Sequence, residues 1–468
     1  MASVSSTGGA DRPPSASGPK AAPPDRLADP KGDAFGAFRR AVAVSPGYGA
    51  WLDASGVDPA RITSIDDVPY LTKRDVFGSD LEQWVEGGGT AEAAELLTSS
   101  GQSGSFSVGV TSRAELLALQ AATDTALRAA GAGEESSTLL LNCLPMGISV
   151  PTTLATVATP SVHLEMAQEI FERVGPSFAR VVILSEPIFL KELAERLFAA
   201  HGASWTANET ACIVGGEWVS ESWRRYVSGL LGMPAPHEQG NTGIMISMGA
   251  AELGMNLLFE NPGLRTIRSL LDESGQAREL FRQDWGYTPT LFAFDPSRLY
   301  IEERQHDDGT STLAFTPLTR RLLPLVRYDL GDLGEIVSPE RVNEQLAALG
   351  SPARLPRPII AFWGRQAAGI TIGGRTVRPE LIKQRLFSYS AEAAVLTGRF
   401  YLDTSPKPVL HVQLRPETVA TPRLAADLGA FLGEATGATS RVKVHAHAEY
   451  PFHLAGDYQH KPTYHPVI

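Results

Sequence analysis

Cysteine is nearly absent from the sequence, with only Cys143 and Cys212 among 468 residues and no Cys-x-x-Cys pair. A disulfide framework is therefore excluded, and we expect a reducing, cytoplasmic compartment. Long apolar runs are also missing. No stretch approaches the roughly 18 to 20 apolar residues that cross a bilayer, and no apolar core follows a basic start at the N-terminus. The sequence predicts a protein without a membrane partner.

Positive charge is in deficit. The chain has 41 Lys and Arg against 52 Asp and Glu, a net charge of −11, and no basic stripe that would neutralise a phosphate backbone. We therefore expect no nucleic-acid partner. The length allows about three domain-sized units, or equally one large and one small domain.

The composition and the pattern of predicted helices and strands change along the chain. Residues 1–33 are rich in Ala, Pro, Ser and Gly and are predicted to be a disordered tail. Strand and helix patterns then alternate, with a buried strand at Thr138–Leu144 and a helix at Pro187–His201, which favours βαβ units and a largely parallel sheet. After Met255 the runs are shorter and strand-like, with a hairpin turn at Asp307–Gly309.

The last hundred residues have the pattern of a smaller α+β unit. Strands are expected at Ala393–Thr397, Val409–Leu414 and Arg441–His447, and a helix at Pro422–Thr436. The predicted fold class is α/β (α+β). A large N-terminal domain, 34–363, has mixed β-sheets flanked by helices, and a small, mobile C-terminal domain spans 364–468.

Two motifs in the last third of the chain carry the most information. The run Arg327–Gly334 places Asp332 in a glycine-flanked turn, and a carboxylate accepts hydrogen bonds from two adjacent hydroxyls such as those of a ribose. The second run, Gly364–Pro379, places Arg365 33 positions later (332 to 365), at the start of a hairpin-like segment. Two motifs in order at a fitting separation are more specific than a lone glycine loop.

This pair resembles the nucleotide-binding and hinge segments of adenylate-forming ligases, and is most similar to those of the phenylacetate-coenzyme A ligase branch. The resemblance implies that Asp332 and Arg365 hold the ribose of ATP in a cleft between two domains. It also implies Mg²⁺, a small-molecule acid, and an acyl acceptor, for which coenzyme A is one candidate. A homodimer stays open. Gln366 and Ala367 stand in the hinge where the family has charged residues, which bears on the usual domain rotation.

A Ser/Gly-rich loop, Leu97–Phe106, offers backbone N–H groups and hydroxyls to phosphate oxygens. It is similar to the phosphate loop of the family, although a plain flexible connection is the alternative from the residues alone. Ser105 stands where the family has a lysine. The resemblance implies nucleotide contacts from four residues of the loop: Ser99, Ser100, Gly101 and Gly104.

The run Gly215–Trp218 resembles the family segment that lines the adenine and substrate side of the pocket. By this resemblance Gly216 and Glu217 bind the nucleotide and Gly215 lines the substrate pocket. A strand-to-helix turn is the alternative, with the Glu217 carboxylate stabilised by a helix N-terminus.

The run His237–Gly243 stands where the family binds the adenylate and Mg²⁺. Thr242 is the implied catalytic contact, but Gly243 replaces the metal-binding acid. Three outcomes stay open: another acid such as Glu238 holds the metal, the chemistry has changed, or ATP turnover is lost. The implied nucleotide contacts of this run are Gln239, Gly240, Asn241 and Thr242.

Two weaker similarities complete the expected site. The turn Asn142–Gly147 falls where the family forms its acid pocket, which implies substrate contacts from Asn142, Met146 and Gly147; a simple strand end is the alternative. Near the end of the chain, Lys461 occupies the position of the catalytic lysine of the family. A solvated lysine is the alternative there.

The sequence thus predicts an ATP-dependent, AMP-forming ligase that activates a small acid, aromatic or otherwise specialised, as its acyl adenylate and transfers it to a thiol or an amine. Two alternatives are kept. One is adenylation of a non-carboxylate acid such as nitrite, used to modify an aromatic amine. The other is a degenerate homologue that binds a ligand without turning over ATP.

Overall fold

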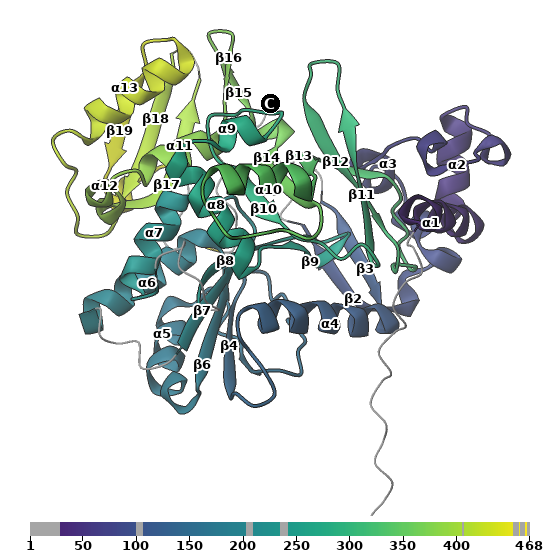
Figure 1. Ribbon diagram of the computed structural model, residues 1–468, viewed down its shortest axis with the longest axis horizontal. Helices are drawn as coiled ribbons and strands as arrows, with labels where there is room; N and C mark the ends of the chain where they lie inside the picture. The colour runs from purple at the N-terminus through teal and green to yellow at the C-terminus, as the bar shows by residue number, and fades with distance from the viewer. Residues whose placement is uncertain are drawn as a thin grey trace, which may run out of the picture.

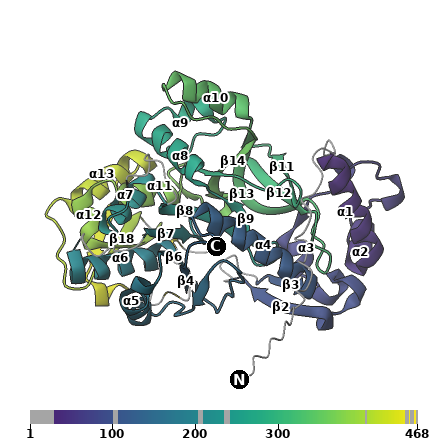
Figure 2. The ribbon, with the colours of Figure 1, turned by 60° about the horizontal axis from the view of Figure 1, so that its bottom comes forward.

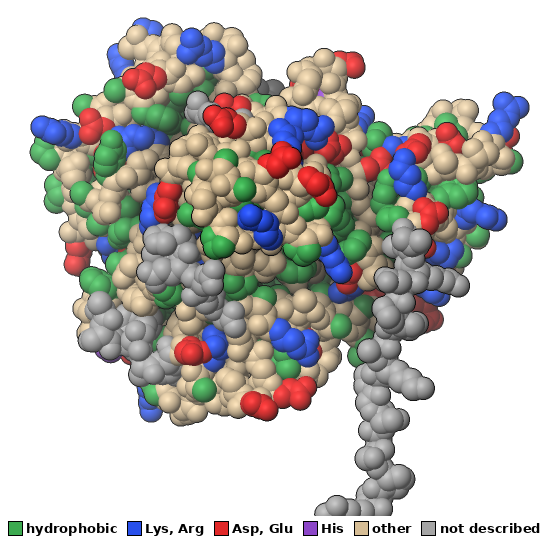
Figure 3. Space-filling model, viewed as in Figure 1, with side chains coloured by type: hydrophobic (Ala, Val, Ile, Leu, Met, Phe, Trp, Pro, Cys, Tyr) green, Lys and Arg blue, Asp and Glu red, His purple; other side chains and the backbone are tan. Residues whose placement is uncertain are grey.

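The structure is a computed structural model, and it describes residues 29–99, 106–202, 209–234, 242–404, 407–452, 458 and 464–465. Two six-stranded sheets form the centre of the described part, and smaller sheets lie at both ends of the chain (Figure 1). On the face drawn in Figure 3, acidic and basic side chains are interspersed without a continuous basic patch. No helix among the described residues has the length and apolar character needed to traverse a bilayer.

The first large sheet is mostly parallel, as predicted from the alternating patterns. Its strand order is β5-β4-β6-β7-β8-β9, and only β9 runs antiparallel to its neighbour. The strands are β4 (Thr138–Cys143), β5 (Thr156–Ala158), β6 (Arg180–Ser185), β7 (Glu209–Val214), β8 (Gly243–Ala250) and β9 (Gly254–Phe259). Every residue of β4 is buried, which explains its continuous apolar run.

Helices cover both faces of this sheet (Figure 2). They include α4 (Arg113–Ala129), α5 (Leu164–Arg173), α6 (Pro187–His201), α7 (Glu221–Leu230) and α8 (Pro262–Ser274). The bounds of α6 match the prediction, because Pro187 stands at its first turn and Gly202 ends it at φ +68°. Ser220 caps α7 by accepting a hydrogen bond from the backbone N–H of Trp223.

The second large sheet is antiparallel in the order β10-β14-β13-β12-β11, with the short strand β1 parallel to β13. Its strands are β1 (Leu71–Thr72), β10 (Thr290–Phe292), β11 (Leu299–Gln305), β12 (Ser311–Pro317), β13 (Tyr328–Val337) and β14 (Ile359–Arg365). The predicted hairpin turn joins β11 to β12, where Gly309 has φ +81°. Helix α10 (Pro339–Ala348) and the short α9 (Ala277–Leu280) lie over this sheet.

The N-terminal part adds helices and a two-stranded sheet beside the second large sheet. It consists of α1 (Pro30–Val44), α2 (Pro46–Ala54), α3 (Lys73–Phe77), β2 (Ala93–Thr98) and β3 (Val108–Ser112). Helix α1 begins inside the segment predicted to be a disordered tail. Asp29 accepts a hydrogen bond from the backbone N–H of Gly32, and Pro30 is favourable in the first turn.

The C-terminal elements lie beside α6 and α7 in both ribbon views (Figures 1 and 2). They are β15 (Ile370–Ile372), β16 (Arg375–Val377), α11 (Pro379–Leu386), α12 (Ser390–Val395), β17 (Leu396–Asp403), β18 (Val409–Leu414), α13 (Leu424–Thr436) and β19 (Arg441–His445). The expected strand at Ala393–Thr397 is wrong in its first half, because the alanine-rich run before Leu396 forms α12. The last expected strand ends at His445, two residues early.

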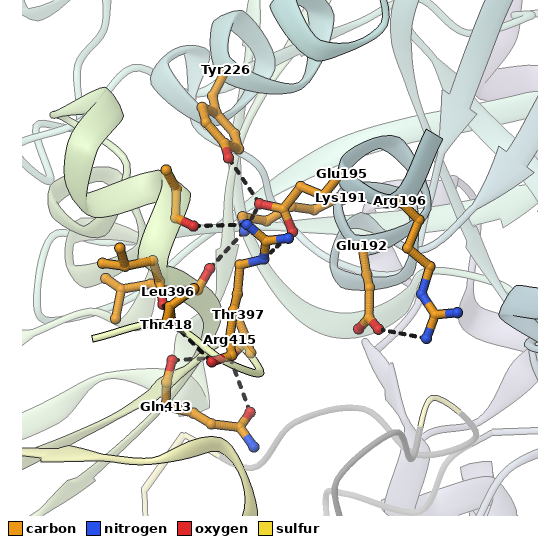
Figure 4. Close-up of polar contacts among 12 residues, drawn as sticks. Lys191, Glu192, Glu195, Arg196, Tyr226, Leu396, Thr397, Gln413, Arg415 and Thr418 are labelled. Atoms are coloured by element: carbon orange, nitrogen blue, oxygen red, sulfur yellow. Dashed lines mark hydrogen bonds and ion pairs between the residues drawn. The ribbon is translucent and has the colours of Figure 1, made fainter. Parts of the chain in front are cut away.

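A buried polar network joins these C-terminal elements to α6 (Figure 4). The Lys191 ammonium donates to Glu195 Oε1 at 2.6 Å and to the carbonyl oxygen of Leu396 at 2.6 Å. Arg415 Nε lies 2.8 Å from Glu195 Oε2, and the Tyr226 hydroxyl donates to Glu195 Oε1 at 2.8 Å. The side chains of Lys191 and Glu195 are only 1% and 3% exposed. Burial lowers the pKa of Lys191 to about 8, although the nearby Glu195 opposes this.

Removing the Glu195 carboxylate is expected to destabilise the protein strongly. The substitution Glu195→Ala leaves the buried Lys191 and the partly buried Arg415 without their shared acceptor, and loss of the partner of a buried charge typically costs about 3 to 5 kcal/mol. Urea unfolding measures this cost. The control is Glu169→Ala, which breaks the exposed Arg173–Glu169 pair on α5, and its unfolding midpoint should stay that of the unsubstituted protein. Equal midpoints for the two variants would contradict a stabilising role for the network.

Candidate active site

Asp332 lies on β13 directly opposite Arg365 of β14. Its side chain is 1% exposed, and its Oδ1 is 3.5 Å from Arg365 Nε, whereas the Arg365 side chain is 54% exposed. Strand β13 bulges here, since its pairing with β12 shifts between Asp329 and Leu333 and Gly331 has φ +73°. The predicted glycine-flanked turn is therefore wrong: Asp332 and its flanking glycines lie within β13, at a bulge of the strand.

The other residues of the Arg327–Gly334 run have structural contacts. Arg327 donates to the carbonyl oxygens of Asp66 and Val68 and to Glu302 Oε1, and its guanidinium lies over the Tyr70 ring at 4.0 Å. Asp329 accepts from Arg304 Nη1 at 2.9 Å. These contacts attach the N-terminal segment to β13, and they leave Asp332 as the residue of the run beside the exposed Arg365.

The backbone of Arg365 is held by a series of contacts through Arg378, Tyr287 and Trp218. Arg378 donates to the carbonyl oxygen of Arg365, and its Nε contacts the Tyr287 hydroxyl at 3.0 Å. The Tyr287 hydroxyl donates to the carbonyl oxygen of Trp363 at 2.6 Å, and its ring packs edge-on against Trp218 at 5.0 Å. The Gly215–Trp218 run and the Arg365 strand are therefore connected through Tyr287.

Two charged residues that the sequence analysis did not assign to the site contact serines at the two ends of the Ser/Gly loop. Glu252, in the turn between β8 and β9, accepts from the Ser107 hydroxyl at 2.8 Å and from the Tyr328 hydroxyl at 3.0 Å. Lys73, the first residue of α3, lies 3.4 Å from Ser99 Oγ. Burial raises the pKa of the Tyr328 hydroxyl, and its hydrogen bond to Glu252 acts in the same direction.

Ser99 lies at the base of the loop where the sequence analysis placed it. Its backbone N–H donates to the carbonyl oxygen of Ser107 at 2.9 Å, and its hydroxyl accepts from the backbone N–H of Ser107 at 2.9 Å. These bonds close the two ends of the loop. The remaining predicted loop contacts lie outside the described residues: Ser100, Gly101 and Gly104.

Glu217 connects two parts of the chain. Its Oε2 accepts from Lys383 of α11 at 2.9 Å and from the Tyr464 hydroxyl at 2.6 Å. It stands three residues before Ser220, the capping residue of α7, so this carboxylate does not cap that helix. The two neighbouring glycines adopt the expected turn, with Gly216 at φ +89° and the Gly215 N–H bonded to the carbonyl oxygen of Ser185.

A pocket with an empty volume of about 330 Å³ lies between these parts. It is lined by polar groups of Glu217, Lys383 and Tyr464 and by the rings of Trp223 and Phe387. None of Lys73, Asp332 or Arg365 lines it. The pocket is therefore separate from the Asp332 cluster, although Glu217 belongs to a predicted nucleotide segment.

The structure gives a steric reason for the glycine at position 243. Gly243 has φ +125°, and a Cβ atom there would overlap with Arg265 Nη1. Arg265 is 1% exposed and donates to the carbonyl oxygen of Thr242 at 2.6 Å. Around this position no glutamate side chain fits without moving a buried guanidinium. The backbone of Thr242 is thus fixed by Arg265, which comes from α8.

The other members of this run, Glu238, Gln239, Gly240 and Asn241, and the predicted catalytic Lys461 lie outside the described residues. Within the described ranges, no group of three or more His, Cys, Asp or Glu side chains is arranged to hold a metal ion. Gly243, which stands where the resemblance implies a metal-binding acid, leaves no space for a Cβ atom unless the Arg265 guanidinium moves.

The predicted acid-pocket residues form a tight turn after β4. The Asn142 side chain donates to the carbonyl oxygen of Ile148 at 2.9 Å and accepts from the backbone N–H of Leu144 at 3.2 Å. Met146 and Gly147 both have positive φ, 59° and 66°, and the Met146 side chain is 42% exposed. Asn142 therefore closes the turn that presents Met146 to the surface.

Comparison with known proteins gives a match at the level of structure alone. No family model matches the sequence, and no curated protein matches it. The structure is similar to 2-hydroxyisobutyryl-CoA ligase in its postadenylation state with R3-HIB-AMP, at a TM-score of 0.66 and 14% identity over 93% of this chain and 88% of that chain. The chain has the adenylate-forming fold. The likeness does not distinguish the phenylacetate-CoA ligase branch.

The structure is also similar to two further conformations of the same ligase. An open conformation with 2-HIB-AMP and CoA gives a TM-score of 0.54 over 89% of this chain and 86% of that chain. The thioesterification state gives 0.52 over 89% and 85%, again at 14% identity. The postadenylation state with 2-HIB-AMP gives 0.63 over the same 89% of this chain. The arrangement of this chain is therefore more similar to the postadenylation state than to the other two.

The register of β13 and β14 depends on a glycine before Arg365. Gly364 has φ +110°, and a Cβ atom there would overlap with Glu380 Oε1. We expect Gly364→Ala to destabilise the protein by at least about 1 kcal/mol more than Gly350→Ala. Gly350 is the matched control, because it also has positive φ, +71°, but an added Cβ meets no atom within 4 Å. Urea unfolding of both variants measures the difference, and equal losses would show that Glu380 yields at no cost.

Proposed function

We propose that the protein is an ATP-dependent, AMP-forming ligase that activates a small acid as its acyl adenylate and transfers the acyl group to a thiol or an amine. The observation that carries this proposal is the pairing of buried Asp332 with exposed Arg365. Lys73 directly follows β1, which pairs with β13, and its ammonium contacts Ser99 at the closed base of the Ser/Gly loop. This arrangement offers a carboxylate for two hydroxyls next to cations for phosphate oxygens.

In this proposal different residues bind the ribose and the phosphates of ATP. Asp332 accepts hydrogen bonds from the two ribose hydroxyls, and Arg365 donates to the ribose beside it. Adenylation is an in-line displacement at the α-phosphorus: the acid oxygen forms the new bond, and the bond to the pyrophosphate oxygen breaks. The residues around the phosphates must stabilise the charge on the phosphoryl oxygens and the leaving pyrophosphate. Thr242 and Lys461 are the predicted contacts for that charge.

We infer two domains close to the predicted bounds of 34–363 and 364–468, with the nucleotide between them; the first also includes the start of α1 at Pro30 and the end of β14 at Arg365. The C-terminal elements contact the larger part through Glu195 and through Glu217, which binds Lys383 and Tyr464. The solved ligase with which this fold compares has structures with an acyl adenylate and CoA, which supports ATP and CoA as ligands of this chain. A soluble, cytoplasmic enzyme of specialised metabolism, acting on an aromatic or other small acid, is part of the proposal.

The steric block at Gly243 favours a second candidate. Because the Arg265 guanidinium lies against Gly243, a metal-binding acid at this position would have to displace it. That observation supports either a different acid, such as nitrite used to modify an aromatic amine, or a degenerate homologue that binds nucleotide without turnover. Both alternatives keep the nucleotide site at Asp332. They differ in whether ATP is turned over.

Acid-dependent exchange of pyrophosphate into ATP separates these candidates. We expect exchange with at least one member of a panel of aromatic acids, small aliphatic acids and nitrite, because reversal of the adenylation step returns labelled pyrophosphate to ATP. Exchange with nitrite alone selects the non-carboxylate reading. If nucleotide binds but no acid supports exchange, the catalytic proposal is wrong and the degenerate homologue stands.

Nucleotide binding should depend on Asp332. The isosteric change Asp332→Asn replaces one acceptor oxygen by a donor, so we expect ATP affinity to fall by about 10-fold or more in calorimetry. Asp308→Asn, on the exposed β11–β12 turn, is the control and should bind ATP as the unsubstituted protein does. A thermal melt of each variant shows that the fold is kept. Unchanged affinity of Asp332→Asn would refute the ribose assignment.

A further inference from the structure

Lys73 stands at the meeting point of the predicted nucleotide segments. Strand β1 pairs in parallel with β13, with Thr72 opposite Asp329, and Lys73 follows directly. Its ammonium reaches Ser99 Oγ at 3.4 Å, at the closed base of the Ser/Gly loop. The segment Leu71–Lys73 thus contacts both the strand that carries Asp332 and the base of the loop.

The backbone around Lys73 is held rigidly. Asp75 accepts from the backbone N–H of Thr72 at 2.8 Å, which forms a capping box at the start of α3. Arg327 of the neighbouring strand binds the carbonyl oxygens of Asp66 and Val68. The ammonium is therefore presented from a fixed segment, as a preorganised charge requires.

Two nearby charges change the pKa of Lys73 in opposite directions. Burial lowers the pKa of Lys73. The Glu252 carboxylate raises this pKa, and Arg365 lowers it further. The Glu252 carboxylate already accepts hydrogen bonds from Ser107 and Tyr328. Two cations, Lys73 and Arg365, thus share one region with Asp332, where an anion would be stabilised by both.

We propose that Lys73 binds a phosphate group of the nucleotide and supplies, from a different segment, the positive charge that the Ser/Gly loop lacks at Ser105. This inference rests on the proposed nucleotide site at Asp332. An ammonium carries three donors and acts as a point charge on phosphate oxygens. The 3.4 Å contact with Ser99 is long for a hydrogen bond, and a phosphate oxygen would make a shorter, charge-assisted one.

At Gly243, which stands where the resemblance implies a metal-binding acid, a Cβ atom would overlap with Arg265 Nη1. Protein cations are then more important for the phosphates, whatever metal accompanies the nucleotide. Arg265, the other cation of that region, is 1% exposed and bonded to the carbonyl oxygen of Thr242. Lys73 is only partly buried, and it contacts the loop base itself.

Calorimetry with ATP and with adenosine tests this role on the full-length protein. For Lys73→Met we expect ATP affinity to fall about 10-fold or more, the usual loss for a hydrogen bond to a charged group, while adenosine affinity stays within about twofold. Lys73→Arg keeps the charge and should retain most of the ATP affinity. The control is Lys31→Met, which removes an exposed lysine paired with Asp66 and should bind both ligands normally.

The two ligands separate the possible failures. If Lys73→Met binds ATP as tightly as Lys31→Met does, or loses adenosine and ATP affinity equally, the phosphate role is overturned, and in the second case the role of Lys73 is structural. If the unsubstituted protein binds neither ATP nor adenosine, the proposed function itself fails. A loss confined to ATP is the only result that supports the inference.

Discussion

The antiparallel pairing of β13 with β14 is the constraint on which the candidate site depends. It sets Asp332 opposite Arg365 across two consecutive strands that are joined through α10. The bulge in β13 and the positive φ of Gly364 adjust that pairing so that the carboxylate is buried while the guanidinium reaches solvent. Around this pair the sheet acts as a rigid support, which is how a ribose and its phosphates can be held in a single position.

A second layer of contacts links the two large sheets. Glu252 follows the parallel sheet, and its carboxylate binds Tyr328 of the antiparallel sheet and Ser107 near the Ser/Gly loop. On the opposite side, Glu195 and Glu217 bind side chains of the C-terminal elements. Each of these carboxylates lies where two parts of the chain meet, so charge pairing, and not apolar packing alone, sets the arrangement of the parts.

Much of the fold could be predicted from the sequence because its signals are local. The buried strand β4, the bounds of α6 and the β11–β12 hairpin follow from apolar runs, Pro187 and Gly309. The strand before Thr397 was misplaced, because an alanine-rich turn of helix precedes it. Asp332 and Arg365 were found as a motif pair, and their direct opposition was not needed for that prediction.

The contacts that complete the site could not be predicted, since they join distant segments. Glu217 meets Lys383 and Tyr464, which follow it by 166 and 247 positions. Lys73 reaches Ser99, 26 positions later, only because β1 joins the sheet beside β13. Pattern and spacing carry no information about such meetings, which depend on how the sheets are ordered.

The steric relation between Gly243 and Arg265 bears on how this chain can change. A glutamate introduced at position 243 would meet a buried guanidinium that also holds the carbonyl oxygen of Thr242. A single substitution to an acid at position 243 would therefore displace that guanidinium, and removing Arg265 would release the backbone of Thr242. Positions 243 and 265 are thus sterically coupled: an acid at the first requires a new place for the guanidinium of the second.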